Sequence, residues 1–113
     1  MLLRRLVLLA GLLGATTVDA GFYTGNILYA FMTSQVVGES GAATAYVAGV
    51  ADADEFTVTA RRTAPQFCIP KGVTGSQAID VVKKYLEVHP EQRHYPAAGL
   101  VVLAFAEVFP CPK

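Results

Sequence analysis

Residues 97–109 read AAGLVVLAFAEVF, a run that is apolar except for Glu107. Pro96 comes directly before it, and proline is well tolerated in the first turn of a helix. A helix that is apolar on every side is buried, and this run is shorter than the roughly 20 residues that span a membrane. Pro110-Cys111-Pro112 then stops it. We therefore predict the central helix of a small bundle over residues 97–109.

The segment before this run contains a clear helix start at Thr74-Gly75-Ser76-Gln77. In such a capping box the threonine hydroxyl accepts from the amide three residues on, and the glutamine side chain reaches back to the threonine amide. Pro90 ends the helix, because it disfavours helical geometry at His89. The apolar face of this predicted helix consists of Ala78, Val81, Val82, Tyr85 and Leu86. A single further turn is expected at residues 91–94.

Two more helices are predicted in the N-terminal half. Thr24 is a suitable N-cap for a helix that begins near residue 25, and Gly38 fits the position just after its end. Apolar and small residues then recur every three to four positions over residues 42–55. We expect residues 56–72 to be irregular, because a short strand-like triplet and two prolines interrupt any helical pattern.

The last turn of the predicted 42–55 helix is acidic. Asp52, Asp54 and Glu55 stand where the helix dipole favours cations. We expect these carboxylates to be solvated or to meet Arg61 and Arg62, which follow closely in the sequence.

Residues 1–20 have the pattern of a cleaved secretory signal peptide. Arg4 and Arg5 form a positive start, residues 6–14 are apolar, and Val18-Asp19-Ala20 offers a cleavage point before Gly21. A retained anchor or a buried helix is the alternative. Cleavage leaves residues 21–113 as one domain in the periplasm, without a stable membrane anchor.

Cys68 and Cys111 are the only cysteines. Disulfides persist in exported proteins, so these two are expected to pair. A disulfide between them would close residues 68–111 into a loop. Closing a loop of this length is worth about 4 kcal/mol in the chain-entropy model. Unpaired thiols, or a bridge between chains, are the alternatives. The patterns together predict an all-α bundle of four to five helices with one disulfide.

Composition excludes several classes of function. The 9 Lys and Arg residues balance the 9 Asp and Glu residues without a basic stripe, so nucleic acid is not an expected partner. No polybasic cluster indicates binding to a membrane surface. Gly72-Val73-Thr74-Gly75 lacks the lysine of a phosphate-binding loop, and no serine lies in a G-x-S-x-G context. We expect a protein that is not an enzyme and that needs no cofactor.

The densest polar cluster is HPEQRH at residues 89–94. One interpretation makes His89, Glu91 and His94 a metal or acid–base site. The other makes the cluster a polar corner between helices, in which Arg93 pairs with a carboxylate. The histidines lack the H-E-x-x-H spacing, and the two cysteines lie too far apart in sequence for a zinc site. We therefore favour the corner and expect no bound metal.

The 5 tyrosines divide into two groups. Tyr46 and Tyr85 lie on apolar helix faces, where we expect them to belong to the core. Tyr23, Tyr29 and Tyr95 are better candidates for an exposed interface, in which tyrosine is common.

A series of short motifs runs in order through nearly all of residues 21–113. The motifs are FYTGNILY at 22–29, YVAGV at 46–50 with Asp52, FCIP at 67–70, VT at 73–74 with Gln77, DVV at 80–82 with YL at 85–86, HPE at 89–91 with Arg93, and FPCP at 109–112. In this order and spacing they resemble the Tai/Rap family of type VI secretion immunity proteins.

The resemblance implies an exported helical protein that binds a peptidoglycan amidase and blocks it by covering its active-site cleft, commonly as a homodimer. One departure concerns a second cysteine pair that the family usually has in its first two helices. Met32 and Ala43 stand at the corresponding positions. We expect packing of a soft apolar residue against a small one to substitute for that bridge.

Two regions are candidates for contact with a protein partner, because exposed loops carry recognition more often than cores do. They are the expected irregular segment 54–65 and the polar corner 89–95. The candidate contact residues are Arg61, Arg62, His89, Glu91, Arg93, His94 and Tyr95.

Two other classes of function compete with immunity. A general periplasmic chaperone would need surface that is exposed in acid, and the chain is not enriched in histidine or carboxylates for that role. A small hydrolase would need the nucleophile or metal set that the sequence lacks.

Overall fold

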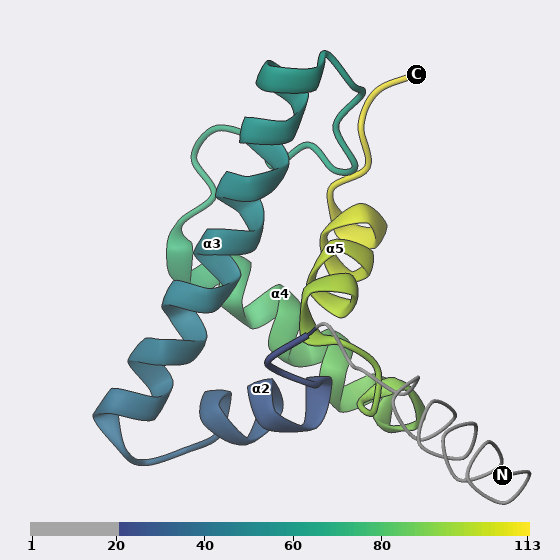
Figure 1. The fold of residues 1–113 in the computed structure, drawn as a ribbon. Coiled ribbons are helices and arrows are strands. Elements are labelled where there is room, and N and C mark those ends of the chain that lie inside the picture. Colours follow the sequence, from purple (N-terminus) through teal and green to yellow (C-terminus); the bar gives the residue numbers. More distant parts are fainter. Residues whose placement is uncertain (1–20) are drawn as a thin grey trace, which may run out of the picture.

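The computed structural model describes residues 21–113; the predicted signal peptide at residues 1–20 lies outside the described residues. The described chain folds into four α-helices and one 3₁₀ turn (Figure 1). They are α2 (Gly25–Met32), α3 (Val37–Arg61), α4 (Gly75–Val88), η1 (Pro90–Gln92) and α5 (Ala97–Val108). No strand forms between residues 21 and 113, which confirms the predicted all-α bundle. No helix in this part of the chain is long and apolar enough to cross a membrane.

Helix α5 is the centre of the bundle, as its apolar sequence predicts. It packs against α2, α3 and α4, and α3 runs the length of the molecule beside it in Figure 1. Five of its side chains are buried: Ala97, Leu100, Val101, Ala104 and Phe105. The other buried apolar side chains are Leu28, Ala43, Val47, Phe67, Val82 and Leu86. Burial of this apolar surface is the main force that assembles the helices.

The predicted capping box at the start of α4 is confirmed. The Thr74 hydroxyl accepts from the Gln77 amide at 3.1 Å, and the Gln77 Oε1 atom accepts from the Thr74 amide at 2.8 Å. The helix ends before His89, whose amide donates to the Tyr85 carbonyl, and Pro90 opens η1. The local sequence signals therefore set both ends of this helix.

The predicted boundary between the first two helices was wrong. Helix α2 ends at Met32, where the Thr33 hydroxyl donates to the Tyr29 carbonyl at 2.9 Å. The Ser34 hydroxyl then accepts from the Val36 amide at 3.0 Å and shapes the turn. Gly38 does not follow a helix end but lies in the first turn of α3. Local side-chain hydrogen bonds thus stop α2 before the glycine.

Helix α3 is longer than predicted at both ends. Residues 56–61 are helical rather than irregular, and α3 ends with Arg62 in the left-handed region at φ 54°. The Thr57 hydroxyl donates to the Ala53 carbonyl at 2.8 Å, so a residue with strand propensity is accommodated in the helix. Val58 of this half of α3 is partly buried and lines the same cavity as Phe67.

The predicted Cys68–Cys111 disulfide is confirmed, with the two Cα atoms 4.8 Å apart. The Cys68 amide also donates to the Phe109 carbonyl at 2.8 Å. These two links join the segment after α3 to the tail that follows α5, at the end of the molecule where the carboxyl terminus lies in Figure 1.

The start of α2 is joined to the chain just before α5. The Gly25 amide donates to the Tyr95 carbonyl at 2.9 Å, and the Asn26 amide donates to the Arg93 carbonyl at 2.8 Å. A Cβ atom on Gly25 would lie 2.9 Å from the Arg93 backbone, which is closer than real contacts allow. Only glycine permits this approach.

Candidate functional site

The two predicted contact regions lie at opposite ends of the molecule. The end of α3 is at the top of Figure 1, and the corner around η1 is at the lower right. The structure therefore does not bring the predicted contact residues together into one site.

In the polar corner, His89 Nδ1 and Glu91 Oε1 lie 3.2 Å apart and form an ion pair when the imidazole is protonated; no other such contact within 4.0 Å occurs among residues 21–113. A hydrogen bond from its own backbone amide, and then one from His89, hold the pKa of the Glu91 carboxyl below its usual range. Glu91 is exposed and His89 is partly covered by the Tyr85 ring, whose centroid lies 4.3 Å away. The corner interpretation of this cluster fits these contacts.

Arg93 belongs to the fold of the corner rather than to its outer surface. Its Nε atom donates to the Leu86 carbonyl at 2.6 Å, and its guanidinium carbon lies 4.1 Å from the Tyr29 ring centroid. The predicted pairing of Arg93 with a carboxylate does not occur. The side chain instead ties η1 to α2 and α4.

Three predicted contact residues of the corner are exposed: Glu91, His94 and Tyr95. The rings of His94 and Tyr95 lie 4.2 Å apart between centroids, and 52% of the Tyr95 surface is exposed. Tyr23 and Tyr29, also expected at a surface, are half-buried against the core. Of the three tyrosines predicted to be exposed, only Tyr95 is therefore available to a partner.

The end of α3 differs from the expectation in two respects. Arg61 and Arg62 are exposed, but neither forms an ion pair with a carboxylate among residues 21–113. Asp54 is buried, with 8% of its surface exposed, instead of being solvated. A Gln66 side chain donates to its Oδ1 atom at 3.1 Å.

Sequence reasoning placed two residues in the contact segment 54–65 without recognising how each is exposed or buried. Phe56 is 71% exposed, which is unusual for so large an apolar side chain. No signal for it was available once residues 56–72 were interpreted as irregular. Asp54 does carry a signal, because it lies seven residues, about two helical turns, after the buried Val47. A carboxylate in the register of a buried face indicates a special environment.

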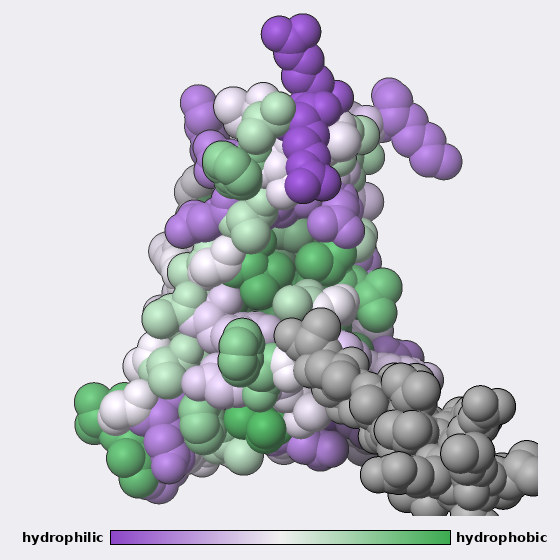
Figure 2. Space-filling model, in the orientation of Figure 1, coloured by the Kyte–Doolittle hydropathy of each residue, from purple (hydrophilic) through white to green (hydrophobic). Residues whose placement is uncertain are grey.

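Helix α5 leaves part of its surface uncovered. Tyr95, Gly99, Val102 and Leu103 line an open cavity of about 490 Å³, and Leu103 is 51% exposed. Figure 2 shows apolar side chains over α5, to the right of the centre of the view. This face is available to another apolar surface.

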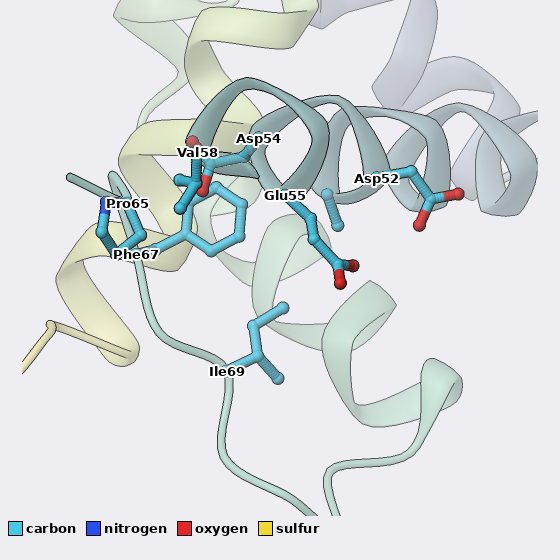
Figure 3. A pocket seen from close by; sticks show the side chains of 8 residues that line it. Asp52, Asp54, Glu55, Val58, Pro65, Phe67 and Ile69 are labelled. Atoms are coloured by element: carbon cyan, nitrogen blue, oxygen red, sulfur yellow. The ribbon is translucent and has the colours of Figure 1, made fainter. Parts of the chain in front are cut away.

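A second open cavity, of about 280 Å³, lies between α3 and the segment that the disulfide holds (Figure 3). We call it the α3 notch. Its apolar lining is Ala51, Val58, Pro65, Phe67 and Ile69, and its acidic lining is Asp52, Asp54 and Glu55. A concave site with an apolar wall and a few charged groups suits recognition of another side chain.

No group of three or more His, Cys, Asp or Glu side chains between residues 21 and 113 is arranged to hold a metal ion. The described surface offers exposed side chains and several open cavities, and these features suit noncovalent binding.

The family model of the Rap1a immunity proteins matches residues 24–111. The matched segment begins at the N-cap of α2 and ends at Cys111, so it contains every described helix and both halves of the disulfide. No curated protein matches the chain.

Proposed function

Because the chain belongs to the family of Rap1a immunity proteins, we propose that it binds and neutralises a toxic effector protein of type VI secretion. The effector that we infer is a peptidoglycan amidase, and the chain inhibits it by covering the active-site cleft. The observation that carries this proposal is the match of one immunity family over the whole folded domain. The amidase rests on the motif series that resembles the Tai/Rap proteins.

A periplasmic location follows from the same proposal, since peptidoglycan is in that compartment. The Cys68–Cys111 disulfide supports it, because such bridges persist in oxidising compartments and are rare in the cytosol. We propose that residues 1–20 are the signal that exports the chain and that residues 21–113 are the mature domain.

The end of α3 is the surface that we favour for contact with the effector. Exposed aromatic and arginine side chains are typical anchors of protein interfaces. Three such side chains lie within two helical turns here: Phe56, Arg61 and Arg62. The polar corner is the second candidate, through Glu91, His94 and Tyr95. Its Arg93 is already engaged by the fold.

The homodimer that the resemblance implies is also part of the proposal. The exposed apolar face of α5, around Leu103, is the surface that such a dimer would cover. Sedimentation equilibrium of the wild type and of a Leu103→Glu variant tests this, because a charge in an apolar interface weakens association strongly.

The test of the function is inhibition of a peptidoglycan amidase effector of type VI secretion. The protein is expressed with its own leader, purified from the periplasm and mixed with the purified amidase. We expect hydrolysis of peptidoglycan to fall to background at equimolar protein. Full activity in the presence of excess protein would contradict the proposal, and binding to many unfolded proteins instead would favour a chaperone.

A further inference from the structure

The α3 notch contains a carboxylate whose negative charge no cation of the described chain balances. Asp54 is 8% exposed, and no Lys, Arg or His nitrogen among residues 21–113 lies within 4.0 Å of its oxygens. Its one side-chain partner is the neutral amide of Gln66, which donates to Oδ1. Carboxylates this far from water are normally paired, because burying an unpaired charge is costly.

The second oxygen of Asp54 keeps some contact with solvent. It accepts no hydrogen bond from the described side chains, and no side-chain oxygen or nitrogen of those residues is both buried and unpaired. Since Asp54 lines the notch, the solvent that this oxygen meets is the solvent within it. A hydrogen-bond donor that enters the notch can therefore reach the carboxylate.

The other residues that line the notch also favour a positively charged group with an apolar stem. Figure 3 shows Glu55 extending from α3 toward the opening above Ile69, while Phe67 lies deeper between α3 and the loop. The notch thus has an apolar wall for carbon atoms and two carboxylates for a positive charge. Asp52 lies about one turn further along the helix and adds a third negative charge to the rim.

We propose that the α3 notch receives a basic side chain, arginine or lysine, that projects from the effector. The methylene stem packs against Phe67 and Ile69, as long basic side chains do on apolar surface. The charged head pairs with the acidic lining of the notch, and arginine suits the site best, because its planar guanidinium presents several donors that match a carboxylate. This inference rests on the proposed function, since it supplies the chemistry of one contact in that complex.

The main experiment compares two double variants in binding to the amidase. Asp54→Asn with Glu55→Gln removes both charges and leaves a side-chain oxygen to accept from Gln66. Asp80→Asn with Glu87→Gln is the matched control, because it removes the same net charge from exposed positions on α4. The dissociation constant is measured by calorimetry in buffers of low and moderate salt.

We expect the notch variant to bind about tenfold more weakly or worse, with a smaller dependence on salt, and the control to bind within about twofold of the wild type. Thermal melting of each variant shows whether the fold is retained. Equal binding by the wild type and a folded notch variant would overturn the notch assignment and leave the proposed function standing. No binding by the wild type would overturn the proposed function.

A second measurement does not depend on the effector. N-acetyl-L-argininamide is added at millimolar concentration to the isotopically labelled protein, and N-acetyl-L-leucinamide serves as the neutral comparison. We expect the arginine compound alone to shift the amide resonances of residues 51–58 and 65–69, and the notch variant to lose these shifts. Absence of the shifts in the wild type would overturn the assignment even where the amidase binds.

Discussion

Gly25 lies where two parts of the backbone meet most closely. A Cβ atom there would lie 2.9 Å from both the Cα and carbonyl oxygen of Arg93, and backbone atoms cannot move aside as a flexible side chain can. The residue is therefore fixed by packing, and this reason is invisible in the sequence, where Gly25 looks like an ordinary residue at a helix start.

We predict that Gly25→Ala lowers the free energy of unfolding by about 1–3 kcal/mol, because it forces apart α2 and the corner. Gly49→Ala in α3 is the control, since nothing lies within 4 Å of the added Cβ atom and alanine favours helix. Urea denaturation followed by circular dichroism measures both. Equal stability of the two variants would show that the corner is not as tightly packed as described.

The sequence interpretation and the structure predict different effects of removing the Arg93 side chain. If Arg93 were an exposed contact residue, its removal would weaken binding to the partner and leave the folding stability unchanged. Its bonds to the Leu86 carbonyl and the Tyr29 ring predict a loss of folding stability instead.

We expect Arg93→Ala to reduce the free energy of unfolding by about 1–3 kcal/mol, because a charged hydrogen bond and a cation–π contact disappear together. Arg61→Ala is the control, because it removes an exposed arginine that forms no ion pair among the described residues. It should change the free energy of unfolding by less than about 0.5 kcal/mol. Thermal and urea unfolding of both proteins check this. A stable Arg93→Ala protein with impaired binding would restore the contact role.

At the scale of the helices, the sequence is reliable where a local signal and the tertiary fold agree. The capping box of α4 and the apolar run of α5 each specify their helix, and both form as predicted. The end of α2 and the length of α3 were not predictable in the same way. Gly38 is compatible with either a helix end or a helix start, and only the hydrogen bonds of Thr33 and Ser34 decide.

The same reasoning explains what was missed at the candidate site. Residues 56–59 have weak helix propensity, so nothing in the sequence indicates that the helix continues to Arg61. Because the helix was not expected to continue, Phe56 and the notch around Asp54 were not expected either. Exposure of Arg61 and Arg62 could be predicted from residue type, because arginine is rarely buried without a partner.

We predict that Thr74→Ala lowers the free energy of unfolding by about 1 kcal/mol, because the Gln77 amide loses its acceptor and the capping box is broken. Ser76→Ala, two residues on, is the control and should be neutral within about 0.5 kcal/mol, since its hydroxyl makes no hydrogen bond within the described chain. Chemical denaturation distinguishes them. Equal effects would mean that the cap contributes little to α4.

At the scale of the whole molecule, the disulfide joins the segment after α3 to the tail after α5 at one end of the bundle. It fixes the segment that carries Pro65, Phe67 and Ile69 against the tail after α5, and those three residues form one wall of the α3 notch. The core that remains is modest, as in any domain of this size. The bridge should therefore matter both for stability and for the shape of the notch.

We expect the double variant Cys68→Ser, Cys111→Ser to lose about 4 kcal/mol of unfolding free energy, the value for closing a loop of this length. Guanidinium denaturation of the oxidised wild type, the reduced wild type and the variant gives the comparison. The reduced wild type should match the variant. A variant as stable as the oxidised protein would show that helix packing alone holds the fold.

Protection of living cells tests immunity most directly. The amidase effector is directed to the periplasm of a heterologous bacterium, together with either the full chain or a chain that lacks residues 1–20. The proposed function predicts that the amidase alone lyses the cells, that the full chain restores growth, and that the chain without its leader does not. Lysis in the presence of well-expressed, exported full chain would contradict the immunity function.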